Sequence, residues 1–240
     1  MTIRGYRVPM LASLLVWLVA WEIVGQTGAV FLVPPVTSIV EAGIAMVQTG
    51  TWQRATVDTL RAYGLGMGLS IAVGVPLGVL MGRSKPADRL LGMWVNLFVS
   101  APLSALVPIL MILLGFGETT VVATVFLFAV WIIALDTRAG IRHVPPSLEE
   151  MGRCYGASPV ALYGKSILWA ALPEILAGIR LGLIRGVKGV VIGQLLVAII
   201  GYGELFELYS RSFDMEHFWA LTFLLFAAAM VLSSLVEAME

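Results

Sequence analysis

Charged residues are scarce in this chain of 240 residues, where Asp, Glu, Lys and Arg together make up 12%. Soluble domains carry about a quarter charged residues. The hydrophobic fraction reaches 59%, and the mean hydropathy is +0.94. These values exclude an ordinary soluble domain and predict an integral membrane protein.

Residues suited to catalysis or metal binding are scarce as well. The single cysteine, Cys154, excludes an internal disulfide, and the isolated His143 and His217 fit polar positions at membrane interfaces better than metal sites. With a net charge of zero and no basic cluster with interleaved aromatics, nucleic-acid binding is not expected. The apolar runs contain no paired histidines and no nucleophile with a base within reach, so we expect neither an enzyme nor a metal site.

Long apolar runs dominate what is present. They predict an all-α integral membrane protein, with one transmembrane domain over residues 1–240 and six membrane-spanning helices. The first run contains Trp17, Trp21 and Glu22 and lacks a small-residue cleavage site, so we interpret it as a retained span. The expected spans cover residues of about 10–25, 60–81, 92–114, 119–135, 172–200 and 218–236.

Glycines follow a helical spacing in two of these spans. In the second, Gly74, Gly78 and Gly82 recur every fourth residue, a pattern that lets two helices approach closely in lipid. In the fifth, the glycines lie within an arc of about 80° on a helix. These are Gly178, Gly182, Gly186, Gly189 and Gly193.

Other residues predict breaks and short helices. Pro102 and Pro108 should kink or break the third span. Ser38 followed by Glu41 fits a capping box and predicts a short helix, which we expect to lie along the membrane surface.

A polar insert at residues 147–166 separates the fourth and fifth spans. Ser147 with Glu150 fits a second capping box and predicts a short helix there. The run Gly156-Ala157-Ser158-Pro159 should end that helix, and a second short helix can follow to about Lys165. Two short helices in water suit the docking of a partner better than the holding of a ligand.

The distribution of Lys and Arg predicts the orientation of the chain. One side takes the N-terminus, a charged loop at 83–92 and the segment 136–166, and it holds most of the cations. The other side takes only Arg54, Arg61 and Arg211. By the positive-inside rule, both termini and the insert are cytoplasmic. The cations of the first side are Arg4, Arg7, Arg83, Lys85, Arg89, Arg138, Arg142, Arg153 and Lys165.

The insert resembles the EAA loop of permease subunits of bacterial ATP-binding-cassette importers. Glu150 and Gly156 have the separation of the family's Glu and Gly, and Ala157-Ser158 follows. Ile167-Leu168 and Ala170-Ala171-Leu172-Pro173 are similar to the end of the motif. The sequence departs from the pattern at Met151 and Gly152, where the family has two alanines, and at Trp169, where a proline is common.

The likeness extends over nearly the whole chain and is similar to the nitrate/sulfonate/taurine branch of these importers. The other matching segments are Trp21-Glu22, Val33-Pro34-Pro35-Val36-Thr37-Ser38, Thr59-Leu60-Arg61 with the glycines up to Gly82, Leu114-Gly115-Phe116-Gly117-Glu118 and Thr137-Arg138-Ala139-Gly140-Ile141-Arg142.

The resemblance implies a permease of the bacterial inner membrane that pairs with a second permease, usually an identical copy in this branch. Two cytoplasmic ATPase subunits and an extracytoplasmic binding protein complete such a transporter. The chain has no Gly-x-x-x-x-Gly-Lys-Ser/Thr loop, so ATP and Mg²⁺ are expected on the partner ATPase and no cofactor in this chain. Carried over from the family, contact with the ATPase falls on Glu149, Glu150, Gly156, Ala157, Ser158 and Pro159.

The cations of the fifth span have two interpretations. Inserting a cation into a span costs about 2.5 to 3.5 kcal/mol, so Arg185 and Lys188 should face protein or an aqueous path. They either line the path for a small anionic solute, with Gln194 as a further candidate, or pair with a carboxylate such as Glu22 or with a backbone carbonyl. The alternative function is a self-sufficient secondary transporter or channel, against which the sequence shows no inverted repeat.

Overall fold

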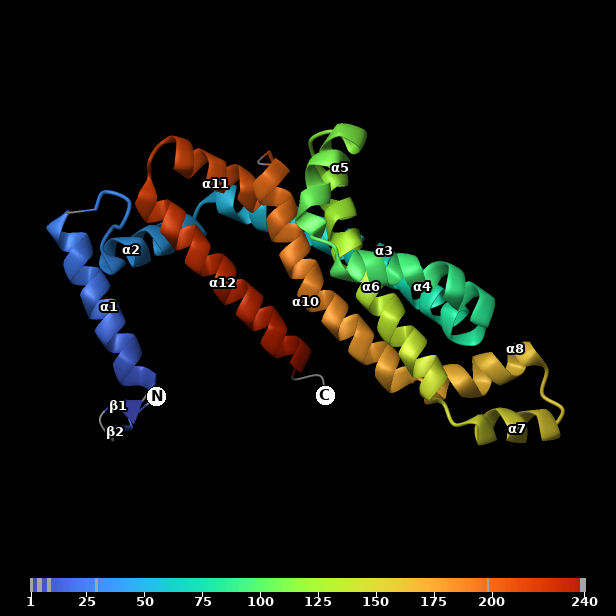
Figure 1. The fold of residues 1–240 in the computed structure, drawn as a ribbon. Coiled ribbons are helices and arrows are strands. Elements are labelled where there is room, and N and C mark those ends of the chain that lie inside the picture. The colour runs from blue at the N-terminus through green and yellow to red at the C-terminus, as the bar shows by residue number, and fades with distance from the viewer. Residues whose placement is uncertain (1, 4–5, 8–9, 29, 198, 238–240) are drawn as a thin grey trace.

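The computed structural model describes residues 2–3, 6–7, 10–28, 30–197 and 199–237 (Figure 1). Its regular structure is helical, as predicted, apart from two short strands, β1 (Thr2–Ile3) and β2 (Tyr6–Arg7), which pair antiparallel. Strands of two residues have no hydropathy period, so the sequence pattern gave no sign of them. Arg4, which counts toward the predicted orientation, lies outside the described residues.

Helices account for most of the remaining described chain. The longer ones are α1 (Met10–Thr27), α3 (Gly50–Arg83), α4 (Lys85–Ser100), α6 (Glu118–His143), α10 (Leu172–Val197) and α12 (Met215–Glu237). The shorter ones are α2 (Val36–Val47), the 3-10 turn η1 (Leu103–Leu106), α5 (Val107–Leu114), α7 (Pro146–Cys154), α8 (Pro159–Leu162), the π-helical turn η2 (Tyr163–Ile167), α9 (Leu168–Ala170) and α11 (Tyr202–Arg211).

Two helices of the described chain, α3 and α6, are long and apolar enough to cross a membrane, or up to four if each bent pair is one span. The first pair bends by 98° between α4 and Leu103–Leu114, and this confirms the break predicted from Pro102 and Pro108. The second bends by 64° between Pro159–Ala170 and α10. Shorter apolar stretches lie in α1, α2 and α12.

The charged loop expected at 83–92 is wrong. Helix α4 starts at Lys85, directly after α3, and only Ser84 separates the two helices. The Ser84 hydroxyl accepts a hydrogen bond from the Ala87 amide at 3.4 Å, and Pro86 in the first turn needs no partner for an N–H group. The sequence reasoning overlooked this serine cap because it treated the charges as a loop signal.

Both predicted capping boxes are also wrong, although both short helices exist. Helix α2 follows Pro35 and helix α7 follows Pro145, and neither has a side-chain hydrogen bond at its cap. Ser38 and Ser147 lie inside the first turn instead. The N-cap residues are Pro35 and Pro145, so both helices begin two to three residues earlier than the capping boxes predicted.

The centre of the molecule is α6, which lies between α3 and α10 (Figure 1). A Cβ atom added at Gly78 of α3 would lie 2.5 Å from the Ala134 carbonyl oxygen of α6, and one added at Gly182 of α10 would lie 2.6 Å from Cγ1 of Ile133. The glycine spacing therefore predicted the contacting faces of both helices. Helices α1, α2, α11 and α12 lie to one side of this unit (Figure 1).

Candidate coupling segment and charged sites

The insert between α6 and α10 projects beyond the ends of both helices (Figure 1). Its first helix, α7, ends at Cys154, and Gly156 has a φ of +74°, a conformation that residues with a side chain rarely adopt. Ser158 then caps α8 by accepting a hydrogen bond from the Ala161 amide at 3.3 Å. The predicted break at Gly156-Ala157-Ser158-Pro159 is confirmed. The second helical stretch reaches Ala170 rather than Lys165.

The two halves of the insert differ in burial. Leu162 and Ile167 are each 3% exposed and pack in one apolar cluster with Ile141 of α6 and Ile175 of α10. Helix α7 has no buried residue. The stretch from α8 to α9 is therefore anchored on the membrane helices, and α7 is held mainly through the turn and through its contact with α8.

Gly152 explains one departure from the family pattern. A Cβ atom at this position would overlap Cδ1 of Leu162, so the absence of a side chain lets α7 lie directly against α8. Met151, the other departure in α7, points outward and is 52% exposed.

The free surface of the insert combines charge with large apolar groups. Tyr155 is 86% exposed and Val160 is 79% exposed, with Glu150, Ser158 and Pro159 also exposed between or beside them. Glu149 forms an ion pair with Arg153 at 2.5 Å, and Ala157 is half-buried. Exposed apolar groups with a polar rim are typical of a surface that a partner covers.

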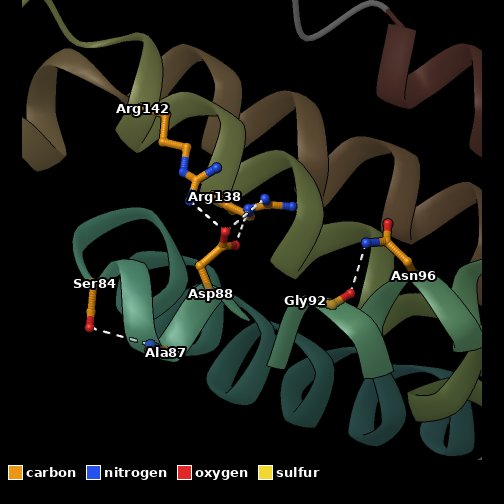
Figure 2. Close-up of polar contacts among 7 residues, drawn as sticks. All are labelled: Ser84, Ala87, Asp88, Gly92, Asn96, Arg138 and Arg142. Carbon is orange, nitrogen blue, oxygen red and sulfur yellow. Dashed lines mark hydrogen bonds and ion pairs between the residues drawn. The ribbon is translucent and has the colours of Figure 1, made fainter. Parts of the chain in front are cut away.

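A mostly buried carboxylate joins α4 to α6 beside the insert. Figure 2 shows Asp88 of α4 between Arg138 and Arg142 of α6. The distances are 2.5 Å from Arg138 Nε to Asp88 Oδ1 and 2.6 Å from Arg142 to Asp88 Oδ2. The Asp88 side chain is only 15% exposed, so the two arginines compensate for the desolvation of its charge. Farther along α4, the Asn96 side chain donates to the Gly92 carbonyl oxygen (Figure 2).

A carboxylate that was not expected from the sequence lies near Arg185. Arg185 is half-buried in α10 and interacts electrostatically with Asp136 of α6. The suggested partner Glu22 is wrong, because its oxygens accept hydrogen bonds from Thr37 and Gln26 at the edge of the molecule. Asp136 lies just beyond the fourth expected span, and the approach of Gly178 to its Cβ atom shows why the two helices bring it near Arg185.

Gln194 and Lys188 lie in different surroundings. Gln194 is 1% exposed, and its amide donates to the Thr59 hydroxyl at 2.9 Å, which links α10 to α3. Lys188 is exposed and lines a cavity of about 770 Å³ between α10, α11 and α12, with Glu207 among the other lining residues. The lining of this cavity includes neither Arg185 nor Gln194.

The polar segment near α11 forms no metal cluster. Within the described residues, no group of three or more His, Cys, Asp or Glu side chains is placed to hold a metal ion. Glu207 instead pairs with Arg211, and His217 lies 2.9 Å from Asp214. Burial, with a smaller contribution from the Asp214 charge, raises the pKa of Tyr209 in this segment.

The fold and the insert define a class of membrane transport protein. Residues 74–240 match the family described as the binding-protein-dependent transport system inner membrane component. The match covers more than half of the chain, and the chain belongs to this family of permease subunits of ATP-binding-cassette transporters. The resemblance found in the sequence is thereby confirmed, and the family consists of transport components rather than enzymes.

Three similar proteins support the assignment. A probable ABC transporter permease protein of Brucella melitensis is 29% identical over 205 residues, which are 85% of this chain and 83% of that protein. The taurine transport system permease protein TauC of Escherichia coli is 30% identical over 156 residues, 65% of this chain and 56% of that protein. The inward-facing MetNI methionine ABC transporter shares the fold, with a TM-score of 0.67, 21% identity and coverage of 79% of this chain and 94% of that chain.

Proposed function

We propose that the chain is the transmembrane subunit of an ATP-driven importer and forms the path for a small anionic solute delivered by a binding protein. The observation that carries this proposal is the insert, whose α7 presents an exposed face while α8 to α9 are anchored on α6 and α10. Such a segment can transmit a force from a bound ATPase. The family match supports the same function.

The proposed assembly contains two copies of this chain, two ATPase subunits and one binding protein in the bacterial inner membrane. We infer a single permease domain over residues 1–240 with six crossings, formed by α1, α3, α4 with α5, α6, α10 and α12. Both termini and the insert, residues 147–166, face the cytoplasm in this arrangement. The concentration of Lys and Arg on that side supports the orientation.

Contact with the ATPase is assigned to Glu149, Glu150, Gly156, Ala157, Ser158 and Pro159. Pull-down of the tagged chain, co-expressed with the ATPase of its transporter, tests this assignment. Deletion of residues 150–158 should abolish co-purification, and Glu150→Arg should weaken it roughly tenfold or more, as expected for a central interface residue. Glu204→Arg, an exposed charge reversal on α11, is the matched control and should have no effect.

Two results would contradict the coupling proposal. One is full ATPase recovery with the 150–158 deletion. The other is a stable single component that transports solute by itself in vesicles, which would favour the alternative of a secondary transporter or channel.

The anionic character of the solute is supported by two observations. The permease protein CmpB of Synechocystis, by its name, belongs to a bicarbonate transport system, and TauC belongs to a system for taurine, a zwitterion with a sulfonate group. Lys188 places a positive charge in the cavity between α10, α11 and α12. We assign the path role to Lys188, whereas the surroundings of Arg185 and Gln194 favour roles in assembly for these two side chains.

Lys188→Met in the reconstituted transporter tests the path role. Transport should fall while ATP hydrolysis stimulated by the binding protein continues, and Arg54→Met is the control at an exposed cation elsewhere. Unchanged transport with unchanged coupling to ATP hydrolysis would remove Lys188 from the path.

A further inference from the structure

A second charged cavity lies at the base of the membrane helices, beside the Asp88 cluster. Its volume is about 590 Å³, and it opens between the start of α4, the end of α6 and the insert. Its charged lining consists of more cations than carboxylates. The cations are Arg83, Lys85, Arg89 and Arg142, and the carboxylates are Asp88 and Glu149.

Both carboxylates of this cavity are already neutralised by arginines. Asp88 binds Arg138 and Arg142, and Glu149 binds Arg153. By contrast, the ion pairs found in the described part of the chain include none with Arg83, Lys85 or Arg89. The cavity therefore carries an excess of positive charge that no carboxylate of the described chain offsets.

An aromatic ring holds one of the cations in the wall of the cavity. The Arg83 guanidinium lies over the ring of Tyr163, 4.6 Å from its centroid, and both residues line the cavity. This cation–π contact positions the charge at the end of α3 without neutralising it. Positive groups from α3, α4 and α6 thus converge on one space.

An apolar row on α4 indicates which anion the cavity receives. Lys85, Arg89, Met93 and Leu97 follow each other at four-residue spacing, so they lie on one face of the helix. All four are exposed, with Met93 at 66% and Leu97 at 55%. The row is cationic at the cavity and apolar farther along the helix, which is the order of groups in an anionic phospholipid.

We propose that this cavity binds the phosphate headgroup of an anionic phospholipid, with an acyl chain along Met93 and Leu97. Basic pockets between membrane helices on the cytoplasmic side are suited to such headgroups. A free phosphate would use the cations and leave the apolar row without a role. The proposal rests on the membrane placement of the proposed function, and its test changes Lys85 and Arg89, neither of which is assigned to ATPase contact.

The test measures lipid retained by the full-length chain after purification from vesicles that contain equal amounts of phosphatidylglycerol and phosphatidylcholine. Native mass spectrometry counts each lipid bound to the wild type, to Lys85→Gln/Arg89→Gln and to the control Arg54→Gln. Phosphatidylglycerol retention should fall roughly fivefold for each cation removed, and roughly 25-fold for the pair. The control should retain the wild-type amount, and inorganic phosphate should not displace the lipid.

Three outcomes would overturn the proposal. Equal retention by the double variant and the wild type would show that the cavity holds no lipid. Displacement by inorganic phosphate would assign the site to a free anion. A loss shared equally by phosphatidylcholine, or by the Arg54→Gln control, would show a general change in lipid binding. An intact ATPase pull-down with the double variant keeps this result separate from a failure of the proposed function.

Discussion

In the centre of the molecule, α3, α6 and α10 approach one another at several glycines. At the edge, α1 and α12 meet through aromatic rings, and one glycine of α1, Gly25, lies close to the backbone of Pro35. In the centre, a Cβ atom at Gly74 would lie 2.9 Å from the Val130 carbonyl oxygen. At the edge, the rings of Trp21 and Trp219 lie with centroids 5.1 Å apart, beside an apolar cavity of about 730 Å³. Contacts to backbone atoms leave the central helices little freedom to adapt, while aromatic side chains at the edge can rearrange.

The largest loss of stability is expected where α3 packs most closely against α6. Gly78→Ala places a methyl group against the Ala134 carbonyl oxygen and Thr137, and backbone atoms cannot move aside cheaply. We expect a loss of about 1–3 kcal/mol or more in stability, measured by thermal unfolding in detergent. Gly64→Ala on the same helix meets nothing within 4 Å and should gain up to about 1 kcal/mol through helix propensity. Equal changes in stability for the two variants would contradict the view that close contact at glycines holds the central helices together.

The next largest loss of stability is expected at the ion pairs of Asp88 with Arg138 and Arg142, where α4 meets α6. Asp88→Asn leaves Arg138 and Arg142 without their carboxylate, and the expected cost is about 1–3 kcal/mol in unfolding free energy. Glu149→Gln removes the exposed pair with Arg153 and should cost at most about 0.5 kcal/mol. If Glu149→Gln proved the more destabilising of the two, burial would not govern these pairs.

A smaller effect is expected for the polar link between α3 and α10. A double-mutant cycle of Thr59→Val and Gln194→Leu should give a coupling energy of about 0.6 kcal/mol and at most about 1.7 kcal/mol. The measurement is the difference in unfolding free energy among the four chains. A coupling near zero would show that this side-chain pair does not stabilise the contact between α3 and α10.

A small effect, comparable with that of the polar link, is expected at the edge. Trp21→Phe keeps an aromatic ring and removes the indole N–H that donates to the Pro34 carbonyl oxygen at 3.0 Å. A loss of about 0.5–1.5 kcal/mol is expected, because the partly exposed carbonyl can bind another donor. A loss as large as that of Gly78→Ala would erase the distinction between edge and centre.

Glycine and proline spacing predicted much of the fold because each acts locally. Gly78 and Gly182 mark the contact faces of α3 and α10. The break between α4 and α5 lies at Pro102, although Pro76 is accommodated inside α3. The starts of α2 and α7 could not be assigned as reliably, because a proline and a serine lie two or three residues apart and each can mark the start of a helix.

The charged groups were predicted less well, because pairing depends on the tertiary structure. Arg185 could be identified as a cation that needs compensation, but its neighbour Asp136 lies 49 positions earlier in the chain, as the two residue numbers show. Asp88 was expected in a loop. It lies in the first turn of α4, which Ser84 caps, and it faces Arg138 of α6. In both cases the residue type showed that a charge needed a partner, but the sequence did not show which residue the partner is.

The continuity of the helical turns from Pro159 to Val197 has a mechanical consequence. Helices α8 and α9, with η2 between them, run into α10 through a bend of 64°, and Leu162 and Ile167 fix that bend on the membrane helices. A displacement that α7 passes on to α8 therefore meets no flexible linker before α10, and we expect it to tilt or rotate α10. The glycine face of α10 packs closely against α6, so a movement of α10 is expected to displace α6 as well.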